Sequence, residues 1–284
     1  MIIIRKTIKH RQHKESLSLR FLYHTVPGRC VLRGLVQPGV SRAAGRFLDS
    51  ALSARLVPGF VRRHRIDMTA YRGQRYTSFN AFFTRKKQEA ALSETEGILL
   101  SPCDAFLSAY PVGDDSVFRI KHVEYSLAQL LRDQKVAGRF AGGTCLIFRL
   151  TPQHYHRYSY ACSGRLRLER TLPGVLHTVR PVAYTKRPVF IENSREYVAV
   201  EAANGAWIVQ MEVGALLVGK ICNARPSAVV TAGEEKGYFA FGGSTIILLL
   251  ESGCLAPEGV LADALADAGA EHRVEKGTRL GVLQ

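Results

Sequence analysis

Gly243 and Ser244 stand directly before an apolar, β-prone run in the segment EEKGYFAFGGSTIILLLESG, residues 234–253. A serine hydroxyl can attack the carbonyl of its own preceding peptide bond, and a glycine at that carbonyl has no Cβ to hinder the attack. Elimination from the resulting ester releases the upstream chain as a carboxylate, and the dehydroalanine that remains hydrolyses to a ketone. The pair is therefore either a self-cleavage site that leaves a pyruvoyl group at a new N-terminus or a turn into a strand.

A pyruvoyl group would give the chain an electrophile that no ordinary side chain provides. Its ketone forms a Schiff base with a substrate amine and accepts the electrons left behind when a carboxylate departs as CO2. The Gly-Gly-Ser-Thr sequence is common, however, and its spacing alone favours the turn. The elements around it have to distinguish the two interpretations.

Short apolar runs bounded by Gly, Pro or Asn recur from about residue 98 onwards, as is typical of β-strands. The predicted strands cover residues 144–150, 196–202, 206–213, 215–221 and 245–250. The acidic, Ala-rich segment 258–272 is compatible with a helix or a loop. We therefore predict a β-rich catalytic core, sandwich- or barrel-like, in residues 88–284.

The N-terminal part of the chain has helical periodicity instead. From Val40 to Val57 the apolar residues recur at steps of three and four, which is the period of an amphipathic helix, and Pro58-Gly59 is expected to end it. Shorter apolar-basic stretches precede it at 14–26 and 29–36. The predicted fold class is thus α+β, with a basic, helical, membrane-associating region in residues 1–87.

The positive charge is concentrated in that helical region. The chain has a net charge of +15, and residues 1–87 hold 19 Lys and Arg but only three acidic residues. A segment of this kind faces an anionic partner, either a nucleic acid or a membrane surface. Aromatic residues are not interleaved with the basic ones as nucleic-acid stacking requires. We therefore expect an anionic phospholipid membrane, with the helix from Val40 to Val57 lying in its interface rather than simply packed on the domain.

Other functional classes find little support in the composition. The six cysteines are scattered without a C-x-x-C pair, which speaks against a zinc site, and we predict no metal. The first residues are not typical of a signal peptide, and the sequence has no run of 18 apolar residues, so no transmembrane helix is expected.

Several segments together resemble the phosphatidylserine decarboxylase family, whose processing site reads L-G-S-T or G-G-S-T. The matching segments, in the family's order, are LYHTVPGR, AGRFLDSALS, YTSFNAFFTRK, SPCDAFLSAYPV, PQHYHRYSYACSG, ENSREYV, QMEVGALLVGKI and GEEKGYFAFGGSTIILLLE. The resemblance spans nearly the whole chain and is specific.

This resemblance implies roles for individual residues. Gly243-Ser244 would be the bond that cleaves itself, giving chains of 243 and 41 residues, the second beginning with a pyruvoyl group made from Ser244. Asp104 matches the family aspartate that helps to activate the serine. His156, in Tyr-His-Arg, matches the histidine of the decarboxylation step, for which an imidazole is suited because its pKa lies near operating pH. Without the resemblance, His156 would be interpreted as a surface histidine and Asp104 as a turn residue.

The chain also departs from the family pattern. The family reads D-Y-H-R-x-H, and its second histidine, the general base of maturation, is Ser159 here. A serine cannot relay a proton as an imidazole does. Either His156 serves both steps, or His154 or His177 substitutes, or Asp104 acts more directly; we favour His156, and for His154 we favour an exposed position over a catalytic one.

The resemblance implies a lyase that decarboxylates phosphatidylserine to phosphatidylethanolamine, peripheral to the cytoplasmic face of the cell membrane. Its partners would be that membrane, its lipid substrate and its own two cleaved chains, but no nucleic acid; a homodimer stays open. Two alternatives remain: a pyruvoyl decarboxylase acting on another amine, and an unprocessed membrane-binding scaffold.

Overall fold

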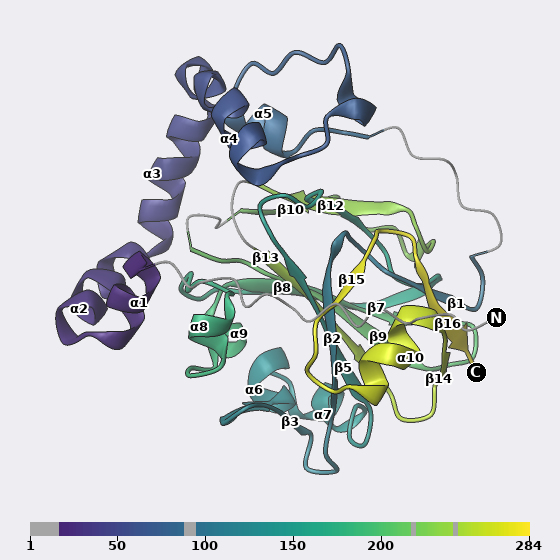
Figure 1. The fold of residues 1–284 in the computed structure, drawn as a ribbon. Helices are drawn as coiled ribbons and strands as arrows, with labels where there is room; N and C mark the ends of the chain where they lie inside the picture. The colour runs from purple at the N-terminus through teal and green to yellow at the C-terminus, as the bar shows by residue number, and fades with distance from the viewer. Residues whose placement is uncertain (1–16, 88–94, 217–219, 241–243) are drawn as a thin grey trace, which may run out of the picture.

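The computed structural model describes residues 17–87, 95–216, 220–240 and 244–284. The first of these ranges forms a helical module that extends as an arm from the β-rich part of the molecule (Figure 1). Its elements are α1 (Leu17–His24), α2 (Val26–Leu35), α3 (Pro38–Asp49), the 3-10 helix η1 (Ala51–Leu56), α4 (Val57–His64), the 3-10 turn η2 (Thr69–Tyr71) and α5 (Phe79–Phe83).

The prediction of one continuous helix from Val40 to Val57 is wrong, because α3, η1 and the start of α4 divide this segment. α3 ends at Asp49, and Pro58-Gly59 does not end a helix but lies in the first turn of α4. A proline is tolerated there because the N–H groups of the first turn have no partner within the helix. The break is fixed by Ser53, whose hydroxyl donates to the Leu48 carbonyl at 2.8 Å and accepts from the Phe79 N–H at 2.9 Å.

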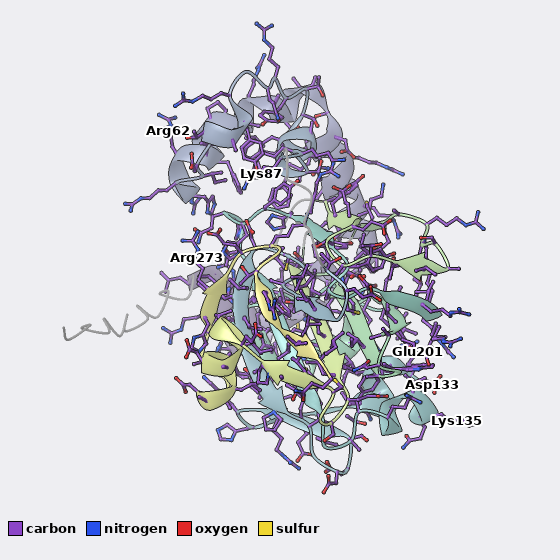
Figure 2. The ribbon with its side chains drawn as sticks, turned by 90° about the vertical axis from the view of Figure 1, so that its right-hand side faces the viewer. Arg62, Lys87, Asp133, Lys135, Glu201 and Arg273 are labelled. Carbon is purple, nitrogen blue, oxygen red and sulfur yellow. The ribbon has the colours of Figure 1, made fainter. Side chains whose placement is uncertain are left out.

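Large apolar side chains are exposed mainly on the helical module. Of the ten that are exposed in the described chain, eight lie between Leu17 and Leu56. Figure 2 shows Arg62, from α4 of the module, at one end of the molecule and Asp133 and Lys135 at the other. Among the described residues, no helix has both the length and the apolar character needed to cross a membrane.

The rest of the chain is built on antiparallel strands. The strands are β1 (Ile98–Leu100), β2 (Ala105–Pro111), β3 (Val117–Ile120), β4 (Val123–Ser126), β5 (Thr144–Leu150), β6 (Arg157–Ser159), β7 (Gly164–Leu172), β8 (Arg195–Glu201), β9 (Trp207–Val213), β10 (Ile221–Asn223), β11 (Val229–Val230), β12 (Glu235–Phe239), β13 (Ser244–Leu250), β14 (Leu255–Pro257), β15 (His272–Val274) and β16 (Arg279–Leu283). Short helices join them: α6 (Leu127–Leu131), α7 (Gln134–Gly138), α8 (Pro181–Tyr184), α9 (Val189–Glu192) and α10 (Gly259–Ala266).

One eight-stranded sheet organises this part, in the order β11-β7-β8-β9-β13-β5-β2-β15. β13 is central and fully buried, paired with β5 on one side and β9 on the other. Its side chains alternate between two cores: Ile246 and Leu248 face a core that includes Tyr158 of β6 and Phe239 of β12, and Ile247 and Leu249 face the other. The small sheet β10-β12-β6 thus covers the first face.

The predicted α+β class, with N-terminal helices followed by a β-rich core, is confirmed. The strands predicted at 144–150 and 245–250 are β5 and β13, and the ambiguous segment 258–272 contains α10. The strand predicted at 215–221 is wrong for Ala215 and Leu216, which lie outside any strand, and residues 217–219 lie outside the described ones. The division of the chain at residue 87 stays a prediction.

Candidate active site

Three strand ends meet at one edge of the large sheet. β13 begins at Ser244, which is paired with Leu150, the last residue of β5. β2 begins at Ala105, directly after Asp104, and is paired with β5 from Phe106 opposite Arg149 onwards. The sheet therefore brings Ser244, Asp104 and the segment that follows β5 to the same edge, although they are far apart in the sequence.

The Ser244 hydroxyl is buried without a partner. The residue is 0% exposed, and its Oγ makes no hydrogen bond to any residue that the structure describes. Leaving a buried hydroxyl unsatisfied costs about 1–3 kcal/mol, so such a group calls for an explanation other than packing. Gly243, the other half of the predicted cleavage site, lies outside the described residues.

His156 is held as a base. Its imidazole is fully buried, and Nδ1 lies 2.8 Å from the His154 carbonyl oxygen. Because a carbonyl can only accept, Nδ1 carries the proton in the neutral ring and Nε2 carries the lone pair. The backbone is fixed as well, since the His156 carbonyl accepts from the Phe239 N–H at 3.0 Å. An imidazole in this tautomer can take a proton at Nε2.

Asp104 lies beside the same segment. Its Oδ1 accepts from the Lys276 N–H at 2.8 Å, and the Tyr155 backbone N–H also bonds to its carboxyl group. Burial raises the pKa of this carboxyl above its usual range, although the Lys276 N–H works in the other direction. The contact with Tyr155 places Asp104 next to the residue that precedes His156.

The Tyr-His-Arg motif also contacts the helical module, residue by residue. The Tyr155 hydroxyl accepts from the Lys87 N–H at 3.1 Å, and Arg157 Nε donates to the Thr84 carbonyl at 2.8 Å. Between them, the Phe83 ring of α5 lies on the His156 imidazole, with ring centroids 4.0 Å apart. The helical module therefore forms one wall of the candidate site.

The structure shows how Ser159 is held at the position of the missing histidine, and how the candidate substitutes His154 and His177 are held. Ser159 is buried on β6, and its N–H donates to the Pro102 carbonyl at 2.9 Å. The favoured exposed position of His154 is wrong, because its ring is buried, its Nδ1 accepts from the Thr151 N–H, and burial beside Arg149 lowers its pKa to about 4. His177 contacts Tyr23 and Glu192 through its two ring nitrogens.

A buried charged network under the site escaped the sequence interpretation. Glu212 on β9 is 0% exposed and accepts from Lys236 Nζ at 2.5 Å and from Gln210 Nε2 at 3.2 Å. Gln210 Nε2 also donates to the Ser159 carbonyl. Burial raises the pKa of Glu212, and Lys236 opposes that shift. The alternation of Gln210 and Glu212 with apolar residues in a predicted strand was the signal, because it places both on one buried face.

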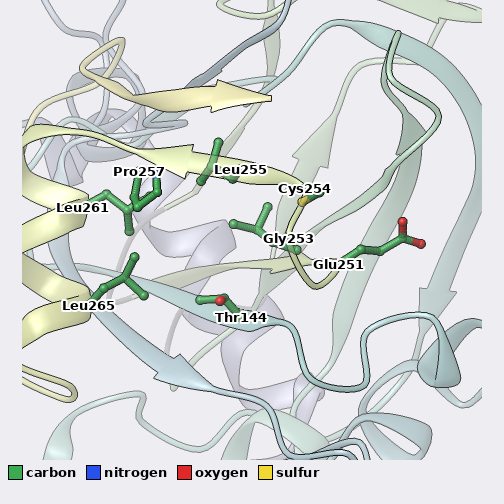
Figure 3. Close-up of a pocket in the computed structure, with 9 residues that line it drawn as sticks. Thr144, Glu251, Gly253, Cys254, Leu255, Pro257, Leu261 and Leu265 are labelled. Atoms are coloured by element: carbon green, nitrogen blue, oxygen red, sulfur yellow. The ribbon is translucent and has the colours of Figure 1, made fainter. Parts of the chain in front are cut away.

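A different cavity lies away from this edge of the sheet. It measures about 70 Å³ and lies at Leu250, the opposite end of β13 from Ser244, among apolar residues of β14 and α10 (Figure 3). Among the described residues, no group of three or more His, Cys, Asp or Glu is arranged to hold a metal ion. The candidate active site is the sheet edge with Ser244, His156 and Asp104, because it combines a nucleophile with nearby acid–base groups.

Comparison with known proteins points in the same direction. The sequence model of the family described as phosphatidylserine decarboxylase matches residues 79–283. Phosphatidylserine decarboxylase proenzyme 2 of Clostridium acetobutylicum is 37% identical over 279 residues, covering 97% of this chain and 95% of the relative. The proenzymes of Ruminiclostridium cellulolyticum and Chlamydia muridarum are 38% and 35% identical, covering 82% and 94% of this chain and 80% and 91% of the relatives.

Proposed function

Since this chain belongs to the phosphatidylserine decarboxylase family, we propose that it converts phosphatidylserine to phosphatidylethanolamine and CO2. The relatives are named as proenzymes, which supports a self-processing step at Gly243-Ser244. The pyruvoyl group produced from Ser244 would be the cofactor, and Ser244, His156 and Asp104 the catalytic residues.

One observation carries this proposal: the Ser244 hydroxyl is completely buried and has no hydrogen-bond partner among the described residues. The hydroxyl of Thr245 is buried in the same way, but only Ser244 follows Gly243, whose carbonyl its hydroxyl could attack. A hydroxyl that must attack the preceding carbonyl needs to be free of competing acceptors and out of water. The apolar surroundings of β13 provide that environment.

His156 is suited to accept the Ser244 proton. Its Nδ1–H is committed to the His154 carbonyl, so Nε2 is the nitrogen with the lone pair. The protonated imidazole can then return a proton to the departing group, as a general base becomes a general acid. Asp104, whose carboxyl bonds to the Tyr155 N–H, holds the backbone next to His156.

A pyruvoyl group at position 244 supplies a carbonyl that binds the substrate amine covalently and accepts the electron pair released with CO2. His156 stands at the same sheet edge and would deliver the proton to the carbon that has lost its carboxylate. Phe83 lies on the imidazole, which is fully buried and so shielded from water.

Cleavage before Ser244 would not separate the two resulting chains. Chain cleavage before Ser244 gives a 41-residue chain that begins with β13. That strand is paired along its length with β5 and, from Thr245 to Leu250, with β9. The two chains would therefore stay associated through the centre of the sheet.

The helical module would hold the enzyme on the membrane. Its exposed apolar residues and its excess of Lys and Arg suit insertion into an anionic interface, each basic residue contributing about 1 kcal/mol. The substrate stays in the bilayer, and the module that would touch the bilayer also touches His156 through Phe83. We assign the protein to the cytoplasmic membrane surface as a peripheral enzyme on these grounds.

The test compares wild type with Ser244→Ala and Thr245→Val. Thr245 also has a buried hydroxyl with no partner among the described residues, but strand alternation turns it to the other face. In mixed micelles with phosphatidylserine, wild type and Thr245→Val should be cleaved and release CO2, and Ser244→Ala should do neither. Normal cleavage of Ser244→Ala would refute the proposal.

A further inference from the structure

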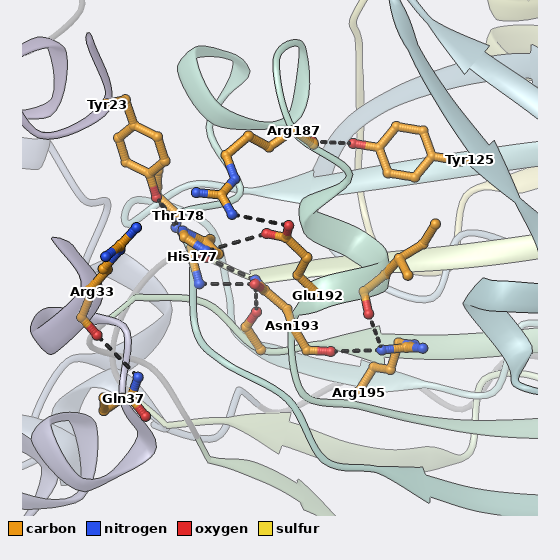
Figure 4. A network of polar contacts seen from close by, with 12 residues as sticks. Tyr23, Arg33, Gln37, Tyr125, His177, Thr178, Arg187, Glu192, Asn193 and Arg195 are labelled. Carbon is orange, nitrogen blue, oxygen red and sulfur yellow. Dashed lines mark hydrogen bonds and ion pairs between the residues drawn. The ribbon is translucent and has the colours of Figure 1, made fainter. Parts of the chain in front are cut away.

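A second, larger cavity lies between α2 and the core. It has a volume of about 440 Å³. Its polar lining consists of Arg29, Arg33 and Gln37 from the α2 side and His177, Arg187 and Glu192 from the core. Figure 4 shows Arg33 and Arg187 approaching His177 from these two sides.

The cavity has fixed walls. Leu32 and Val36 are buried, and the Leu176 N–H donates to the Val36 carbonyl at 2.9 Å, which ties the end of α2 to the core. From α1, the Tyr23 hydroxyl contacts His177 Nδ1 at 3.2 Å and accepts from the Thr178 N–H at 3.0 Å. The arginines are therefore presented by a helix whose position relative to His177 is defined.

The cavity holds an excess of positive charge. Glu192 pairs with Arg187 at 3.1 Å and with His177 at 3.3 Å. Arg29 and Arg33, one helical turn apart, make no ion pair with any residue in the described part of the chain. Three guanidinium groups and one carboxylate thus line the cavity, and of the three only the Arg187 guanidinium is paired with that carboxylate. Guanidinium groups bind phosphate oxygens through pairs of parallel hydrogen bonds, so this lining suits a phosphate group.

The surroundings of the cavity favour a lipid as the source of that phosphate. Val26, one helical turn before Arg29 and on the same face of α2 as Arg29 and Arg33, is an exposed apolar residue. A phospholipid could place its phosphate among the arginines and an acyl chain along Val26. An inorganic phosphate would use only the arginines.

The cavity is too far from Ser244 to hold the phosphate of the molecule that reacts. Asn193 binds both the His177 carbonyl and the Gly214 carbonyl, and it precedes β8, which lies two strands from β13. Two strand spacings correspond to about 10 Å. In phosphatidylserine four bonds separate the phosphorus from the amine nitrogen that would bond to residue 244, a span of about 5 Å.

We propose that this cavity binds the phosphate of a second, anionic phospholipid, which does not react. The inference rests on the proposed membrane function. The bound headgroup fastens α2 to the core, next to the Asn193–Gly214 contact at the end of β9.

Titration calorimetry with monomeric dihexanoylphosphatidylglycerol and the full-length chain tests this site. Wild type should bind it saturably, and the double variant Arg29→Gln/Arg33→Gln should bind at least about tenfold more weakly, because hydrogen bonds to charged groups are lost. Arg187→Gln, which removes the guanidinium group on the core side of the cavity, should also weaken lipid binding. The matched control Arg42→Gln/Arg46→Gln removes the same charge from the exposed surface of α3 and should bind like wild type.

The competing sources give different results. Dihexanoylphosphatidylcholine, with the same chains but no net charge, should bind more weakly than the phosphatidylglycerol. Inorganic phosphate that binds as tightly as the lipid would overturn the lipid assignment, and equal lipid affinity of the cavity and control variants would overturn the site. Cleavage at Ser244 is followed on the same samples, so an uncleaved wild type would refute the proposed function while the titration still decides about the cavity.

Discussion

The aromatic ring of Phe83 lies on the imidazole of His156, with 4.0 Å between the ring centroids. The two residues come from different parts of the molecule: Phe83 ends α5, the last helix of the helical module, and His156 directly precedes β6. On either side of this contact, Lys87 and Thr84 bind Tyr155 and Arg157 through the backbone. The candidate site is therefore completed by the helical module.

Phe83→Leu should lower the turnover number on the order of tenfold, because a misplaced imidazole transfers protons poorly. The matched control is Phe82→Leu. Phe82 is equally buried in the same aromatic cluster, but its ring contacts are with Phe60, Tyr76 and Phe79. Both variants should lose about 1–2 kcal/mol of stability. Equal turnover numbers per folded molecule in the two variants would show that the contact with His156 is only structural.

His156→Asn keeps the hydrogen bond made by Nδ1 of His156 but removes the proton acceptor at Nε2. The asparagine amide can still donate to the His154 carbonyl, but it offers no acceptor at the position of Nε2. Cleavage before Ser244 and, in the cleaved fraction, decarboxylation should each slow by about 10²-fold or more, the usual contribution of a general acid or base. Release of labelled CO2 under single-turnover conditions measures the effect, and near-normal release would remove His156 from proton transfer.

His154 should make the fold sensitive to acid. Its folded-state pKa is lowered to about 4 by burial and by Arg149, whereas an unfolded histidine titrates near 6.5. Below pH 6.5 the unfolded chain therefore binds a proton at His154 that the folded protein does not bind. The free energy of unfolding consequently falls as the pH drops towards 4, by about 3 kcal/mol in all. Urea unfolding at several pH values should show that His154→Asn, which retains an acceptor for the Thr151 N–H, lacks this loss. Parallel pH profiles for the two proteins would contradict the assignment.

The exposed apolar residues of the helical module should be needed for membrane binding. Phe47→Ser/Leu52→Ser removes two of them. As a control, Val229→Ser/Leu265→Ser removes two exposed apolar residues from the surface of the β-rich part. Burying one such side chain stabilises binding by about 1.5–3 kcal/mol, so co-sedimentation with phosphatidylglycerol vesicles should weaken at least about tenfold in the first variant alone. An equal loss in both variants would argue against docking through the module.

Local patterns in the sequence were sufficient for the central strands. The run that became β13 is bounded by glycines and continuously apolar, as a strand buried on both faces must be. The prolines were harder to interpret, since the same residue ends one helix or starts the next. Pro27, Pro38 and Pro58 all lie in first helical turns.

The site itself depends on contacts that no local pattern encodes. Asp104 and Ser244 share an edge because β2, β5 and β13 pair in a particular register. The burial of His154 and the pairing of Glu212 with Lys236 likewise arise from long-range packing. The roles of Ser244, His156 and Asp104 were predicted from the family resemblance.

The mass of the purified, undigested protein tests the central claim most directly. If Ser244 cleaves its own preceding bond, the spectrum should show two chains, residues 1–243 and 244–284, with the shorter one lighter than its serine-initiated sequence by one ammonia. A single chain of 284 residues with an unmodified serine, persisting after long incubation of folded protein, would contradict it.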